Sequence, residues 1–441
     1  MSWRPAQLRA VVVSLHRGNP PDFMDHRAPR RLQSFAVQTL SARALQLLGV
    51  INLLALLAFG AGCGSRAERG EVGGTAGVPG ALPSNFPFNY RDASRGWPLW
   101  PLHRQHPIRA SFLDPRGPYR AGGGGYHFGI DISVDDNRPE PQAPRGFSHE
   151  VYAVEGGEAS DVLGAPRHHV CSARRVSVGH FDYWHVSPIV TPGQHVEAGA
   201  VIGWTCLGEW HMHLAEWASL GGQRIWVNPL HAGGKIAPYT DTAAPVVRRL
   251  RFFSPATGAW RPQSDLAAPD NSTPFIPTRL HGLVELRAEI GDPQSYWGFI
   301  TRHPRWKTLF HPYRVAVVIR SQETRAVVLR RVSFESAQLP RTPYLVHYAP
   351  GTVENKTIPE CLAAPSGTSC SGMYWFRPFS RFRQEFWDTR KVPNGVYDVT
   401  VSAWDLRGNR GSSTTTVVVS NAVLASQTEE QARDGGGAPQ R

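Results

Sequence analysis

The chain has 441 residues, of which 41% are hydrophobic, which is enough to build the cores of two or three domains. A protein that is disordered throughout is therefore excluded. The sequence has 43 glycines and 37 prolines and no long helical heptads, so turns and strands are favoured over helices. We expect a mainly β fold.

The charge balance is basic, with 47 Lys and Arg against 35 Asp and Glu, a net charge of +12. This excess favours anionic surroundings such as wall polymers, lipopolysaccharide or nucleic acid, and solvated surface charge explains it equally well. The chain lacks an arginine-rich helix, zinc-finger spacing and the aromatic signature of RNA-binding domains. We therefore expect no nucleic-acid partner.

An apolar segment at residues 44–62 follows a group of arginines and ends in small residues. This layout is typical of a bacterial signal peptide, so residues 1–62 are predicted to form one, with Met24 as an alternative start. A retained transmembrane helix is disfavoured, because Gln46 and Asn52 interrupt a segment of marginal length.

Cys63 follows in the string Phe-Gly-Ala-Gly-Cys, which resembles a bacterial lipobox except that Gly60 stands where leucine is usual. The resemblance implies that Cys63 becomes a lipid-modified N-terminus. Residues 63–84 are then a lipidated cysteine and a tether rich in Gly, Ala, Pro and Ser. We expect a protein of the bacterial cell envelope, anchored to a membrane by its lipid. The outer membrane, facing the periplasm, is favoured because Gly64 gives no inner-membrane retention signal, and secretion is the alternative.

The remaining four cysteines are Cys171, Cys206, Cys361 and Cys370. Export to an oxidising compartment permits disulfides, and the short intervening loop favours a bridge between Cys361 and Cys370. Pairing of Cys171 with Cys206 is the remaining combination, and it requires a proximity that the sequence does not establish.

A first folded unit is expected at residues 85–238, where short β-rich runs alternate with turns. The glycine-rich run Gly122–Gly125 and the stretch Asn137–Gly146 are predicted to be loops. The predicted strands include Val151–Val154, Arg175–Val178, Val196–Gly203 and Met212–Leu214.

A second unit, at residues 244–424, shows strand after strand and no helical period, which favours an antiparallel sandwich. A Pro-Asn-Gly turn at 393–395 precedes alternating apolar residues up to Trp404, and this resembles the last hairpin of bacterial immunoglobulin-like or fibronectin-like domains. The predicted strands are 283–290, 315–319, 326–334, 344–348, 373–376, 397–404 and 414–419. The polar, glycine-rich tail at 425–441 is predicted to be disordered.

Three blocks of the first unit carry histidines: Tyr126–Asp131, Tyr183–Ser187 and His211–His213. A catalytic zinc ion keeps three protein ligands, typically imidazole nitrogens and carboxylate oxygens, and one open position. His127, Asp131 and one histidine of the third block would supply such a set. Side chains two residues apart on a strand share a face, so the two histidines of the third block should lie beside each other.

In order and spacing these blocks resemble the motifs of the M23 peptidases, the lysostaphin and LytM family, over about Pro107–Trp217. The resemblance implies a LytM-like antiparallel β-sheet peptidase domain followed by an immunoglobulin- or fibronectin-like β-sandwich. It implies that His127 and Asp131 of HxGxD, with His213 of HxH, bind Zn²⁺. It also implies that His211 and an upstream histidine, matched by His185, act in catalysis.

His180 lies five residues before His185 and is the alternative for the upstream catalytic position. The other nearby histidines, His168, His169 and His195, are expected to be structural or surface residues. Trp184 and Trp210 flank the histidine blocks and either wall a groove or pack in a core.

The function predicted from these features is a zinc metalloendopeptidase that hydrolyses peptides of peptidoglycan by zinc-activated water with histidine assistance. The alternative is a non-catalytic LytM-like envelope protein that binds cell wall and regulates another hydrolase; such relatives usually lose zinc ligands. A third interpretation makes the C-terminal strands an adhesin or wall-binding module. The sequence does not identify protein regulators.

Overall fold

The computed structural model describes residues 90–116, 125–134, 141–163, 173–255, 272–295, 308–341, 347–379 and 386–421. The predicted signal peptide, Cys63, the tether, Cys171, the histidines at 168 and 169 and the tail at 425–441 lie outside these ranges. The prediction of a mainly β fold is confirmed, since antiparallel strands build nearly all of the regular structure. Within the described ranges, none of the helices has the length and apolar character needed to cross a membrane.

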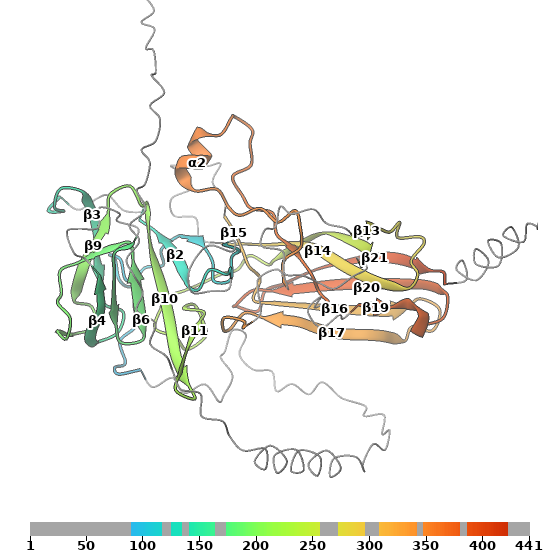
Figure 1. The fold of residues 1–441 in the computed structure, drawn as a ribbon, viewed down its shortest axis with the longest axis horizontal. Helices are drawn as coiled ribbons and strands as arrows, with labels where there is room; N and C mark the ends of the chain where they lie inside the picture. The colour runs from blue at the N-terminus through green and yellow to red at the C-terminus, as the bar shows by residue number, and fades with distance from the viewer. Residues whose placement is uncertain are drawn as a thin grey trace, which may run out of the picture. The chain divides into compact units, whose positions relative to one another are not determined.

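The strands between residues 108 and 227 form two sheets (Figure 1). The larger sheet has the order β1-β2-β10-β6-β5-β4-β8, with β11 paired to β10, and the smaller has the order β3-β9-β7. The strand bounds are β1 Ile108–Ala110, β2 Ile130–Ser133, β3 Phe147–Tyr152, β4 Gly157–Leu163, β5 Arg175–Val178, β6 Phe181–Trp184, β7 Val186–Pro188, β8 His195–Val196, β9 Val201–Cys206, β10 His211–Leu220 and β11 Gln223–Val227.

Strand β10 is central to the larger sheet and determines where the histidine blocks meet. Its apolar residues Met212 and Leu214 are fully buried, which fixes the strand against the core. In the antiparallel register, His213 lies opposite Asp131 of β2 on one side and opposite Trp184 of β6 on the other. Segments far apart in the sequence are thus brought to one point of the sheet.

The prediction of one strand over Val196–Gly203 is wrong. Two strands, β8 and β9, occupy this stretch and belong to different sheets. A turn separates them, and Gly199 adopts a φ of 80° in it, a conformation that glycine reaches without steric cost. The continuous apolar pattern therefore concealed a turn.

The strands after residue 244 form a six-stranded and a four-stranded sheet. The six-stranded sheet has the order β13-β12-β14-β15, with β18 and β19 also paired to β14; the four-stranded sheet has the order β17-β16-β20-β21. The bounds are β12 Val246–Ser254, β13 Thr273–Pro274, β14 Leu283–Pro293, β15 Leu309–Phe310, β16 Arg314–Ser321, β17 Val327–Glu335, β18 Trp375–Phe376, β19 Trp387–Asp388, β20 Gly395–Trp404 and β21 Arg410–Val419, with a 3₁₀ helix, η4, at Thr389–Lys391.

The alternation that predicts strand β20 is visible in its burial. Tyr397, Val399 and Val401 are buried, and the residues between them are less so, as expected for a strand with one face on a core. The predicted strand at 344–348 falls partly outside the described residues, and Tyr348 forms an isolated bridge to Phe376.

The expectation that the second unit lacks helices is wrong at one point. Helix α2 spans Ile358–Ala363 and begins with a capping box, in which the Thr357 side chain accepts from the backbone of Glu360 and the Glu360 carboxylate accepts in return. A disulfide joins Cys361 in this helix to Cys370. A six-residue helix is too short to show a helical period in the sequence.

Candidate metal centre

Three buried donor atoms converge at the junction of β2 and β10. His127 Nε2 lies 2.7 Å from His213 Nδ1 and 3.0 Å from Asp131 Oδ1, and His213 Nδ1 lies 3.1 Å from the same oxygen. All three residues are at most 5% exposed. The structure thus contains a buried His–Asp–His group positioned to hold a metal ion.

The orientation of His127 is fixed by the backbone. Its Nδ1 lies 2.8 Å from the carbonyl oxygen of Ser111, to which it donates, so Nε2 carries a lone pair toward the donor cluster. This is the arrangement that orients histidine ligands in metalloproteins, where the second ring nitrogen donates to a carbonyl or carboxylate.

Gly129 makes room for His213. A Cβ atom at this position would lie 2.8 Å from His213 Nε2 and would also collide with the carbonyl oxygen of Leu214. Any side chain here would push the His213 ring away from Asp131. The glycine between His127 and Asp131 is therefore required by packing against β10.

The donor set fits a zinc ion in chemistry and size. Zinc–nitrogen bonds of about 2.0–2.1 Å in a tetrahedral site place ligand atoms roughly 3.3 Å apart, so the observed separations need widen by only a few tenths of an ångström. With His127 Nδ1 donating to Ser111, the proton between the rings belongs to His213 Nδ1. A metal ion would replace that proton.

The electrostatics keep His127 neutral and Asp131 charged. Burial, aided by the Arg116 guanidinium, lowers the pKa of His127 to about 3. Burial alone would raise the pKa of Asp131, but the His127 and His211 rings outweigh it and hold that pKa well below its usual range. Neutral imidazole and ionised carboxylate are the forms that bind metal.

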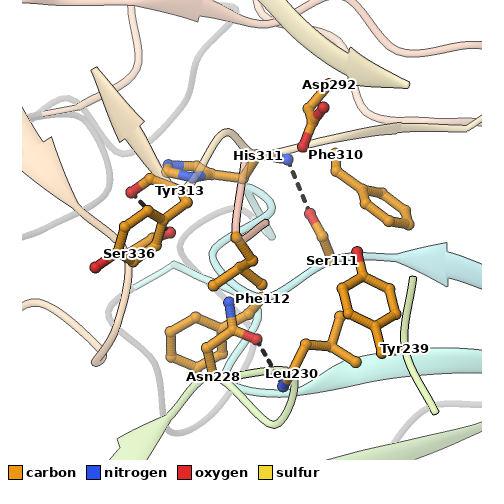
Figure 2. Close-up of a pocket in the computed structure, with 11 residues that line it drawn as sticks. Ser111, Phe112, Asn228, Leu230, Tyr239, Asp292, Phe310, His311, Tyr313 and Ser336 are labelled. Atoms are coloured by element: carbon orange, nitrogen blue, oxygen red, sulfur yellow. Dashed lines mark hydrogen bonds between the residues drawn. The ribbon is translucent and has the colours of Figure 1, made fainter. Parts of the chain in front are cut away.

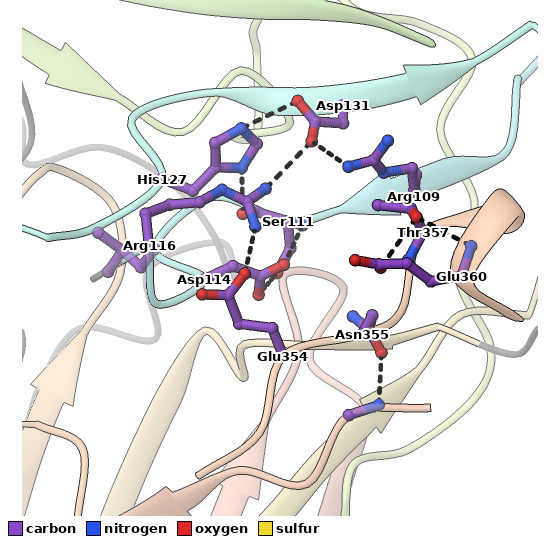
Figure 3. A network of polar contacts seen from close by, with 12 residues as sticks. Arg109, Ser111, Asp114, Arg116, His127, Asp131, Glu354, Asn355, Thr357 and Glu360 are labelled. Carbon is purple, nitrogen blue, oxygen red and sulfur yellow. Dashed lines mark hydrogen bonds and ion pairs between the residues drawn. The ribbon is translucent and has the colours of Figure 1, made fainter. Parts of the chain in front are cut away.

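Two arginines, which the sequence motifs do not indicate, hold the outer oxygen of Asp131 (Figure 3). Arg116 Nη2 donates to Asp131 Oδ2 at 3.0 Å, and Arg109 Nη2 lies 3.8 Å from it. Arg116 also pairs with Glu354 at 3.2 Å. The carboxylate is thereby oriented with Oδ1 toward the histidines, as a monodentate ligand requires.

His211 lies beside the donor cluster. Its Nε2 is 3.7 Å from Asp131 Oδ1, and its Nδ1 is 2.5 Å from the Glu209 carbonyl oxygen and 3.1 Å from Arg109 Nη1. The carbonyl can only accept and the guanidinium can only donate, and the shorter contact, to the carbonyl, favours a proton on Nδ1 and a lone pair on Nε2. Burial, with Arg109 and His185 nearby, holds the pKa of His211 well below its usual range.

His185 lies next to His211. It lies between β6 and β7 with a φ of 64°, and its ring is 4.7 Å from that of His211, at an interplanar angle of 62°. His180 is held elsewhere, by Glu155 at 2.8 Å and by ring contacts with Tyr90 and Trp217. Of the two histidines considered for the upstream position, His185 is the one next to His211.

Aromatic side chains form a wall around His213. The ring of Phe128 lies 4.7 Å from that of His213, and Trp184 contacts both rings. Trp210, by contrast, is 37% exposed with a φ of 60°. Trp184 is only partly buried, so neither tryptophan is a buried core residue.

Glu216, on β10, belongs to a separate buried network. It accepts a hydrogen bond from Tyr90 Oη at 2.5 Å and faces His231 Nε2 at 3.4 Å. Burial opposes protonation of His231, but Glu216 outweighs it and raises the pKa of that imidazole.

Among the cysteines, Cys206 is disulfide-bonded, and Cys171 lies outside the described residues.

No model of a protein family matches the chain, and no curated protein gives a significant match.

Proposed function

We propose that this protein is a zinc-dependent endopeptidase of the M23 type that cleaves peptides of bacterial peptidoglycan. The observation that carries the proposal is the convergence of His127 Nε2, Asp131 Oδ1 and His213 Nδ1, with His211 and His185 directly beside them. Three protein ligands next to two further histidines is the composition of a catalytic rather than a closed structural zinc site.

When bound, zinc would supply Lewis acidity and a lowered pKa for a coordinated water. The chain's own contribution is positional. Arg116 and Ser111 fix the two ligands of the β2 region, and the Glu209 carbonyl fixes the tautomer of His211, which leaves its Nε2 free to accept a proton. His185 is placed to hold or move a proton with His211.

Peptidoglycan as the substrate is proposed from two sequence features, the motif order of the histidine blocks and the predicted export signal. The positive net charge suits a polymer that carries carboxylates. A lipid anchor at Cys63 would hold the enzyme in the envelope, where this substrate lies.

The decisive experiment measures zinc content and muropeptide release by the purified protein and by His213→Ala. We expect about one zinc per chain and release from sacculi in the wild type, and loss of both in the variant. Glu323→Gln is the matched control, because Glu323 is exposed in the turn between β16 and β17. Zinc binding without release would favour the non-catalytic regulator, and absence of zinc would refute the proposal.

A further inference from the structure

A second group of buried acidic residues lies among the C-terminal strands. Asp241 precedes β12, Asp292 is near the end of β14, and Asp405 follows β20. One carboxylate oxygen from each lies within 4.8 Å of the others, and the residues are 6%, 4% and 2% exposed. Three segments that are distant in sequence therefore place three carboxylates at one buried point.

The hydrogen bonds of these carboxylates leave oxygens unused. Asp405 accepts two backbone bonds on Oδ1, from Arg407 and Asn409, and one on Oδ2 from the Asn409 side chain, which leaves Oδ2 able to accept one more contact. Asp241 accepts two backbone bonds on Oδ1, from Ala243 and Ser295, whereas its buried Oδ2 has no hydrogen-bond partner in the described structure.

Asp292 is the least satisfied of the three. Its Oδ1 is buried and has no hydrogen-bond partner among the described residues. Nor does any arginine, lysine or histidine of the described ranges form an ion pair with Asp292, Asp241 or Asp405. A buried carboxylate without a partner is strongly destabilising, so the cluster needs a positive charge or protons to balance it.

Asp292 also borders a small cavity, about 20 Å³ in volume, whose polar lining includes Tyr239 and Ser111 (Figure 2). A space of this size holds about one water molecule. Room for a water next to an unsatisfied carboxylate is a common feature of cation sites, which complete their coordination shell with solvent.

We propose that Asp241, Asp292 and Asp405 bind a hard divalent cation, and specifically Ca²⁺. The donors are all oxygens, with no nitrogen or sulfur that would favour zinc, and they come from the end of a strand and two irregular segments, which suits the variable coordination geometry of Ca²⁺. The ion would join the segment before β12 to β14 and to the loop after β20. This site is separate from the candidate zinc centre and does not rest on its function.

The test titrates Ca²⁺ into the metal-stripped full chain by calorimetry and follows thermal unfolding. In the wild type and in His213→Ala we expect binding of one ion per chain and a rise in Tm of roughly 3–8 °C at saturation. Asp292→Asn should bind no Ca²⁺ and show no rise, whereas Glu323→Gln should behave as the wild type.

Asp292→Asn is preferred to a change at Asp405, because Asp405 holds the loop before β21 through its own hydrogen bonds. Asp292→Asn removes an unpaired charge, so without calcium this variant should melt at or above the melting temperature of the wild type. Such a melting transition would show that the variant is folded. Absence of heat and of a Tm shift in the wild type, or an equal shift in Asp292→Asn, would overturn the proposal.

Discussion

Single residues around the candidate zinc centre act by fixing its ligands. Ser111 sets the tautomer of His127, Arg116 turns Asp131, and Gly129 leaves space for His213. None of these three residues supplies a donor atom to the cluster. They orient the ligands, and removal of such an orienting contact usually lowers metal affinity by about 10–100-fold.

Gly129→Ala is predicted to abolish zinc binding. The new Cβ would collide with the Leu214 carbonyl oxygen and meet His213 Nε2 at 2.8 Å, which forces the imidazole away from Asp131. Zinc content after equilibrium dialysis checks the prediction. Ser219→Ala is the control, since Ser219 is an exposed residue of β10. Equal zinc content in both variants would contradict the steric argument.

His185→Ala should keep its zinc and lose activity, because the residue is not one of the three proposed ligands and its ring lies against that of His211. We expect kcat/KM for muropeptide release to fall by about 10²–10⁴-fold, the usual contribution of general acid–base groups. The companion variant His180→Asn, which alters a contact to Glu155, should keep most of the activity. A larger loss from the His180 change would reverse the assignment.

At the scale of elements, helix α2 and its disulfide order the segment that carries Glu354, the ion-pair partner of Arg116. The bridge closes a loop with a sequence separation of 9 residues. In the chain-entropy description, so short a loop contributes about 2–3 kcal/mol at most.

Replacing Cys361 and Cys370 together by serine is therefore predicted to lower the unfolding free energy by up to about 2–3 kcal/mol. Guanidinium unfolding of the wild type and the double variant measures this. A matched change, Thr357→Ala, removes only the helix cap and should cost about 1 kcal/mol. No difference between the double variant and the wild type would show that the bridge lies in a segment that unfolds independently.

The sequence predicts the strands of the site better than their pairing. Strand β5 has its predicted bounds, and His211 and His213 both lie next to Asp131 as period-two alternation requires. The contact of Arg116 with Asp131 could not be predicted, because no motif encodes it. Helix α2 was missed although its capping box is present, since six residues are too few for a period.

At the scale of the whole molecule, the proposed calcium site joins three segments that carry Asp241, Asp292 and Asp405. No local sequence pattern predicts this site. Each aspartate taken alone looks like a turn residue. Only the tertiary fold brings the three together, so no sequence pattern distinguishes them from other aspartates.

Stability should depend on pH through this cluster when calcium is removed. Burial, with Asp241 and Asp405 nearby, holds the pKa of Asp292 well above its usual range. Since the unfolded chain ionises this group near pH 4, ionisation favours unfolding, and the cluster's contribution to stability falls as pH rises from about 4 toward the folded-state pKa.

The unfolding free energy of Asp292→Asn minus that of the wild type should therefore be near zero at about pH 4 and positive by at least about 1 kcal/mol at about pH 7 in EGTA. Urea unfolding at the two pH values measures the difference. With calcium present at neutral pH, the difference should become negative, because only the wild type is stabilised by the bound ion. A difference that does not change with pH would show that Asp292 is not destabilised by its charge.

Ser111 connects the candidate zinc centre to the C-terminal half of the chain. Its carbonyl oxygen holds the imidazole of His127, while its hydroxyl accepts from the backbone N–H of His311 at 2.9 Å, and two residues later the Leu113 carbonyl accepts from Tyr348 Oη. One short loop is thus tethered on both sides. A displacement of the C-terminal segments that hold this loop would therefore also move a proposed zinc ligand.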